Sequence, residues 1–223
     1  MDIFSLGGVI LDLLKTVVAF WNDKVSLVFE LLGQSPTEFK DGGPWQVISN
    51  IEPIFVAVGS SLVVLFFVIG FCSESIDVKE EIRFETVLRM LMRLSISEWL
   101  VANNVTIMKA FFESIGALVG LITNSGSPKL KIPNEQQEII EGLLMMILAV
   151  IIALVIIFCG FMLIYTVYFR FLKILVIVPF GAIAFSTTSG NRMVSHTAVT
   201  YAKHFLAVLL EAVTMALAII VCN

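Results

Sequence analysis

The chain has 223 residues, of which 58% are hydrophobic and only 14% are charged, with a formal net charge of −4. A soluble domain carries about 25% charged residues, and a globule of this size cannot hide so much apolar surface from water, whereas a bilayer can. The composition therefore argues against a soluble fold, and the scattered basic residues argue against a nucleic-acid-binding groove.

The first part of the chain, residues 1–33, is predicted to form an amphipathic helix or two short ones. Apolar residues recur there at helical spacing, among them Ile10, Val17 and Trp21. Charges break the run before it could cross a bilayer, so we expect either an interfacial helix anchored by Trp21 or a helix packed on a neighbouring subunit. Residues 34–53 are rich in proline and glycine and are predicted to be a loop.

The rest of the chain, residues 54–223, is predicted to be a transmembrane helical domain. Its first span covers residues 54–72, which hold no charge and are long enough to cross about 30 Å of hydrocarbon. Gly59, Ser60 and Ser61 are small, so they would let another helix approach this span closely.

Residues 86–122 are hydrophobic enough for a membrane but are interrupted by polar side chains. One helix of this length would measure about 55 Å, so we expect either a long helix that projects out of the bilayer or a hairpin broken near Asn103 and Asn104. Lipid cannot satisfy the polar groups, which must therefore face protein or water. The candidate intersubunit or pore-facing residues are Arg89, Arg93, Glu98, Asn104, Lys109 and Glu113.

Some charges of this segment have structural interpretations. Lys109 and Glu113 are four residues apart and can pair on one helix face. Arg89 and Arg93 can pair with Glu85 and with carboxylates of partners, or extend to lipid headgroups.

Two further spans are predicted at residues 142–166 and 172–186. Arg170 and Lys173 are predicted to mark a sharp connection between them. The second of these segments is short, so it forms either a full but bent crossing or a re-entrant loop.

A helix kink is predicted at Pro179 and Gly181, because proline lacks a backbone donor. Residues 187–203 are predicted to be a polar loop, and residues 204–222 a last span. A polar stripe falls on one face of this last segment and comprises Thr200, His204, Glu211 and Thr214.

Glu211 is a carboxylate inside an apolar span, which marks a functional candidate. It could relay protons together with His204 on the same face, or it could be bonded to a neighbouring helix or kept protonated by burial. The chain has five crossings if residues 86–122 cross once and six if they cross twice. The distribution of Lys and Arg leaves the orientation open.

The chain carries no recognisable catalytic motif. It lacks a phosphate-binding loop, a nucleophile elbow and a zinc-protease motif, and His196 and His204 lack the companions of a metal site. Cys72, Cys159 and Cys222 are far apart and indicate no disulfide framework. We therefore expect no catalytic residue, no metal, no cofactor and no enzymatic activity.

Three regions together resemble the TrbL-type polytopic membrane subunits of type IV secretion and conjugal transfer systems, especially those of Gram-positive conjugative elements. The first is the amphipathic start of the chain. The second is the charged stretch from Arg89 to Phe112. The third comprises Arg170–Ile174, Val178–Ala184, the polar loop and the final segment that begins near Tyr201–Phe205.

The resemblance implies a non-enzymatic, homo-oligomeric scaffold or channel subunit in the cytoplasmic (inner) membrane. Its partners would be membrane lipid, other secretion subunits such as ATPases and stalk or pilus components, and, indirectly, a DNA–protein substrate. By the same resemblance the polar faces of residues 89–113 and 204–214 would be intersubunit or pore-adjacent. The rival functions are a small ion or solute channel or transporter that uses Glu211 and the charged 86–122 segment, and an assembly factor without a pore.

Overall fold

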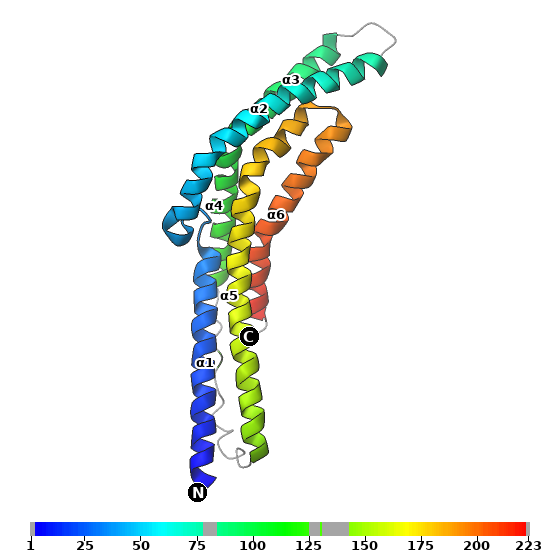
Figure 1. Cartoon of the computed structure of the whole chain (residues 1–223). Helices are drawn as coiled ribbons and strands as arrows, with labels where there is room; N and C mark the ends of the chain where they lie inside the picture. The colour runs from blue at the N-terminus through cyan, green and yellow to red at the C-terminus, as the bar shows by residue number, and fades with distance from the viewer. Residues whose placement is uncertain (1–2, 78–83, 125–129, 131–142, 222–223) are drawn as a thin grey trace. The chain divides into compact units, whose positions relative to one another are not determined.

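The computed structural model describes residues 3–77, 84–124, 130 and 143–221, and every regular element in them is a helix (Figure 1). The predicted all-α fold is therefore confirmed. The elements are α1 (Ile3–Gly33), η1 (Phe39–Gly42), α2 (Gly43–Asp77), α3 (Phe84–Ala102), α4 (Asn104–Asn124), α5 (Leu143–Ser186), η3 (Thr187–Ser189) and α6 (Arg192–Val221).

Four stretches of helix among the described residues are long and apolar enough to cross a membrane: Phe39–Ser73, Asn104–Thr123, Met146–Ser189 and Val194–Val221. Many large apolar side chains on these helices stay exposed, which suits a lipid environment rather than water. The chain therefore has the composition and helices of a membrane protein.

The chain divides into two compact units, each built from several chain segments. Unit 1 contains Met1–Gln34, Ala117–Phe169 and Ala212–Asn223. In this unit α1 is a single helix, the first of the two alternatives predicted for residues 1–33, and Ile10 and Val17 of its apolar stripe are buried. The ring of Phe20 on α1 lies 5.7 Å from the ring of Phe161 on α5, so α1 packs on its own chain. A position of α1 at the membrane interface stays a prediction.

Unit 2 contains Ser35–Gly116 and Arg170–Glu211, and its first helix begins earlier than predicted. The expected loop 34–53 ends at Gly42, because α2 runs from Gly43 and includes Pro53. Lys40, Asp41 and Gly42 have positive φ angles and make the turn. Pro44 then falls in the first helical turn, where no backbone donor is needed.

The segment 86–122 bends at one residue and does not fold back as a hairpin. Helical hydrogen bonds continue through the bend, because the Asn103 N–H donates to the Trp99 carbonyl and the Ile107 N–H donates to the Asn103 carbonyl, both at 3.0 Å. The Asn103 side-chain amide also donates to Trp99 O, at 2.9 Å, and such competition for a backbone carbonyl bends helices. The hairpin alternative, with its break near Asn103 and Asn104, is therefore wrong. The segment follows the long-helix alternative with a bend at Asn103, and its projection out of the bilayer stays a prediction.

The sharp connection predicted at Arg170 and Lys173 is wrong. The two spans expected at 142–166 and 172–186 lie in one continuous 44-residue helix, α5, which is about 66 Å long. Arg and Lys are good helix formers, and no glycine or proline lies beside them to end the helix. Pro179 lies inside α5, and the kink expected there stays a prediction.

The loop predicted for 187–203 is much shorter in the structure, because α6 begins at Arg192. The Asn191 side-chain oxygen accepts a hydrogen bond from the backbone N–H of Val194 at 3.1 Å. This is an N-cap, which starts a helix by satisfying a free backbone donor. The last helix is therefore longer than the predicted span 204–222.

Candidate functional site

Two polar side chains from α4 and α6 donate to backbone carbonyls of α5 just before Pro179. The Asn104 amide donates to the Val178 carbonyl at 3.0 Å, and the Tyr201 hydroxyl donates to the Ile177 carbonyl at 2.9 Å. Asn104 is fully buried. Both carbonyls lie within the turn before Pro179, and each accepts a hydrogen bond from a side chain of a neighbouring helix.

Gly181 allows this contact, because there is no room for a side chain. A Cβ atom at Gly181 would overlap the Asn104 side-chain oxygen and would lie 2.9 Å from the Tyr201 hydroxyl. The Asn104 side-chain oxygen is buried, and no described residue donates to it. The predicted kink residues therefore form a contact between three helices, which we call the Pro179 node: Asn104, Ile177, Val178, Pro179, Gly181 and Tyr201.

A second set of polar contacts holds the turn η3 against α2 and α3. The Ser189 hydroxyl is buried and donates to the Val63 carbonyl at 2.8 Å, and the Ser97 and Thr188 hydroxyls are hydrogen-bonded to each other. Close to them, a Cβ at Gly59 would lie 2.9 Å from the Ala182 carbonyl oxygen. The close helix approach predicted at Gly59 is thus confirmed.

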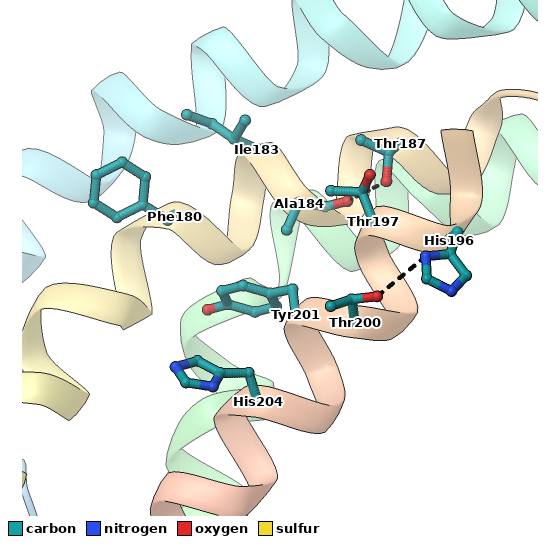
Figure 2. A pocket seen from close by; sticks show the side chains of 9 residues that line it. All are labelled: Phe180, Ile183, Ala184, Thr187, His196, Thr197, Thr200, Tyr201 and His204. Carbon is teal, nitrogen blue, oxygen red and sulfur yellow. Dashed lines mark hydrogen bonds between the residues drawn. The ribbon is translucent and has the colours of Figure 1, made fainter. Parts of the chain in front are cut away.

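An open groove of about 660 Å³ lies beside the Pro179 node, between the end of α5 and the start of α6 (Figure 2). The Thr200 hydroxyl is turned toward His196, 3.2 Å from its Nδ1 atom, and His204 lies on the next turn of α6. The groove is lined by Phe180, Ile183, Ala184, Thr187, His196, Thr197, Thr200, Tyr201 and His204.

The groove offers hydroxyl and imidazole groups above an apolar floor, and it has room for an apolar side chain or a lipid chain. Among the described residues, no group of three or more His, Cys, Asp or Glu side chains is placed to hold a metal ion. The Tyr201 hydroxyl already donates its hydrogen bond to the Ile177 carbonyl. The arrangement therefore supports packing and binding.

Glu211 has a cationic neighbour on α5. Its Oε2 atom lies 3.8 Å from the Lys173 ammonium, and both side chains are partly exposed. The alternative in which Glu211 is bonded to a neighbouring helix is thus present in the structure.

Arg170 is more deeply buried, with 3% of its surface exposed. Its guanidinium lies 5.5 Å from the Phe171 ring centroid, and its Nε and NH1 atoms have no hydrogen-bond partner among the described residues. A buried cation inside an apolar helix is costly unless it is paired.

The candidate residues on α3 and α4 are distributed over several contacts. Arg89 pairs with Glu85 at 3.1 Å, as predicted, and Glu98 accepts a hydrogen bond from Ser60 of α2 at 2.8 Å. Arg93 is half-buried. Of the residues predicted to face a partner or pore, only Asn104 is buried in the Pro179 node.

Lys109 and Glu113 are both exposed on α4. The Lys109 ammonium lies over the Trp45 ring, 5.5 Å from its centroid, and within the described part of the chain it forms no ion pair with Glu113. The pair predicted from their spacing is therefore wrong. An exposed charge at the centre of a spanning helix costs about 2.5–3.5 kcal/mol on insertion scales, so these residues mark the faces that lipid suits least.

Sequence reasoning missed Tyr201, Arg170 and Lys173 as site residues. The charges of Arg170 and Lys173 predict the end of a span, although both residues lie within α5. Tyr201 had one usable signal, because a tyrosine in an apolar helix usually finds a hydrogen-bond partner for its hydroxyl.

Comparison with protein-family models, curated proteins and solved structures finds no match for this chain. The class of protein is therefore defined by the helices and their contacts alone. The chain is an all-helical membrane protein whose polar groups gather at contacts between helices and on a few exposed helix faces.

Proposed function

We propose that the chain is a non-enzymatic scaffold or channel subunit that works as an oligomer in the inner-membrane complex of a conjugative type IV secretion system. The observation that carries the proposal is the exposure of charged side chains on helices apolar enough to span a membrane. They are Lys109 and Glu113 on α4 and Lys203 on α6.

These charges favour protein partners over lipid. Hydrocarbon cannot solvate a carboxylate or an ammonium group, whereas a facing subunit or a water-filled passage can. All three lie on the outside of a single copy. Lys109 interacts with the Trp45 ring and the Glu52 carboxylate of its own chain, whereas Glu113 and Lys203 form no ion pair with a described residue. The shelter of Glu113 and Lys203 therefore has to come from other copies or other proteins. A subunit of a larger membrane assembly meets this requirement.

The contact of Glu211 supports a scaffold over a self-sufficient channel. A proton or ion relay needs a carboxylate that is free to exchange its cation, whereas the Lys173 ammonium lies 3.8 Å from Glu211. The Pro179 node is likewise built of hydrogen bonds that fix helix positions. The particular system, conjugation, rests on the resemblance to TrbL-type subunits set out above.

Affinity purification from mating cells tests the proposal. A tagged chain should co-purify with secretion ATPases and with stalk or pilus components, and deletion of its gene should abolish DNA transfer. Glu211→Gln should leave transfer nearly unchanged, because the residue has a structural role. Normal mating without the gene, or ion conduction by the purified chain alone that Glu211→Gln abolishes, would contradict the proposal and favour the rival channel.

A further inference from the structure

The exposed charges of α4 and α6 have opposite signs and lie on different helices of unit 2. Glu113 is the exposed acid of α4 and Lys203 an exposed base of α6. Neither forms an ion pair with a described residue. Both helices are apolar enough to cross a membrane, so each charge needs a partner at its own depth in the bilayer.

The contacts of unit 2 show that α4 and α6 run in the same direction. Asn104 and Tyr201 both approach Gly181. Further along both helices, the ring of Phe112 lies 6.0 Å from that of Phe205. The pair Phe112 and Phe205 thus defines a common level along the two helices.

Glu113 and Lys203 lie within side-chain reach of one another in level. Glu113 follows Phe112 by one residue and Lys203 precedes Phe205 by two, so from this contact their backbones differ in level by about 4.5 Å, or three residues. From Asn104 and Tyr201, which both approach Gly181, the difference is about 10.5 Å, or seven residues. Lysine and glutamate side chains are long enough to bridge such an offset.

The two charges also point away from each other within one copy. Phe111 and Phe112 face Phe205, and at 100° per residue Glu113 lies about 150° around α4 from their mean direction. Lys203 lies about 160° around α6 from Phe205 by the same measure. Glu113 and Lys203 therefore occupy opposite outer sides of the α4–α6 pair.

Membrane insertion restricts how two copies can meet. All copies of a membrane protein insert in one direction, so they are related by rotation about the membrane normal, and every residue keeps its depth. A contact of like faces about a two-fold axis along this normal would bring Glu113 toward Glu113, or Lys203 toward Lys203, and like charges repel. Opposite charges on opposite sides at one depth instead fit a head-to-tail ring.

We infer that the partner of the α4 face is the α6 face of a second copy, with Glu113 paired to Lys203 of the next copy around a ring. This inference rests on the proposed oligomeric function and names its partner. The remaining outward residues fit a close helix contact, since Thr106 and Ala110 on α4 and Thr200 and Ala207 on α6 are exposed and small. Thr106 precedes Phe112 by six residues and Thr200 precedes Phe205 by five, so the two threonines also share a level.

Cross-linking between differently tagged copies tests the contact in native membranes. With the native cysteines replaced by serine, one copy carries Thr106→Cys and the other Thr200→Cys. The ring predicts a mixed cross-link between the two tags, and no cross-link between two copies that carry the same substitution. Cross-links between like positions, or none at all, would overturn it.

Reversing the charges of Glu113 and Lys203, singly and together, gives a second test. Because the double variant should restore the cross-link, this test does not depend on the folding of any one variant. Glu113→Lys and Lys203→Glu should each lower the mixed cross-link about tenfold, because each places like charges in contact, and the double variant should restore it. No rescue by the double variant, with normal insertion of all three variants, would overturn the pairing. If the chain co-purifies with secretion proteins but this cross-link is absent, the proposed function stands and the ring is refuted. If the cross-link forms but no secretion protein co-purifies, the ring stands and the proposed function is refuted.

Discussion

The two halves of α5 are parts of one helix with different surroundings. In the first half, Leu143–Phe169, large apolar side chains are exposed, such as Leu154 at 62% and Phe158 at 65%. In the second half, Arg170–Ser186, the residues Phe171 and Ile174 are fully buried. The same type of sequence is thus mostly exposed in one half and mostly buried against other helices in the other half.

The difference lies in the polar groups that contact the helix. The second half accepts side-chain hydrogen bonds from α4 and α6, through Asn104 and Tyr201. In lipid, apolar surface does not favour one helix neighbour over another, whereas small residues and hydrogen bonds do. The Pro179 node therefore fixes which helices meet, and the predictions below test whether the second half depends on it more than the first.

Gly181→Ala should have the largest effect. A Cβ there overlaps the Asn104 side chain and crowds the Tyr201 hydroxyl, so we expect a loss of about 3 kcal/mol in the free energy of unfolding, the upper range for overpacking. Unfolding in mixed detergent micelles, followed by circular dichroism, measures it.

Gly120→Ala on α4 is the matched control, because a Cβ at Gly120 would meet nothing within 4 Å. It should leave stability unchanged or raise it by up to about 1 kcal/mol through better helix propensity. Equal effects of the two variants would refute the close contact at Gly181.

Asn104→Ala should cost about 2 kcal/mol, because it removes the hydrogen bond to Val178 and leaves a small cavity. The neighbouring Asn103→Ala is its control. The Asn103 amide bonds only within its own helix, to Trp99, and the residue is half-buried, so the change should stay within about 0.5 kcal/mol. Reversed rankings in the same unfolding assay would show that α4 is held elsewhere.

The sequence allowed much of the fold to be predicted but little of the node. Helical periodicity indicated α1, and the uncharged run 54–72 indicated the core of α2. The adjacent amides at Asn103 and Asn104 lie where α3 ends and α4 begins, although the hairpin predicted there is wrong. These features are local, so they can be inferred from neighbouring residues.

The errors concern helix ends and distant partners. Arg170 and Lys173 look like the end of a span, yet α5 continues through them, because charged side chains do not interrupt backbone hydrogen bonding. The bond from Asn104 to Val178 joins residues 74 positions apart. No spacing rule within one helix indicates which carbonyl of another helix an amide will reach.

Tyr201→Phe should cost about 1 kcal/mol, since it removes one hydrogen bond, to the Ile177 carbonyl, and keeps the ring. Tyr165→Phe is the control in the first half of α5, where the side chain is 63% exposed and stacks on Phe169. It should change the free energy of unfolding by less than about 0.3 kcal/mol. If both substitutions cost the same, the hydroxyl of Tyr201 does not distinguish the two halves.

Arg170→Met should have the smallest effect and the opposite sign. The guanidinium is buried, and two of its nitrogen atoms have no acceptor among the described residues. The cost of burying it outweighs its attraction to the Glu211 carboxylate, so an apolar side chain of similar length should raise stability by about 0.5 kcal/mol. Glu211 keeps its contact with Lys173, and Lys173→Met, which removes that cation, should instead lower stability slightly. A loss of more than about 1 kcal/mol in Arg170→Met would mean that the buried cation is satisfied in the folded protein, and the second half of α5 would then owe part of its burial to a charge as well as to the Pro179 node.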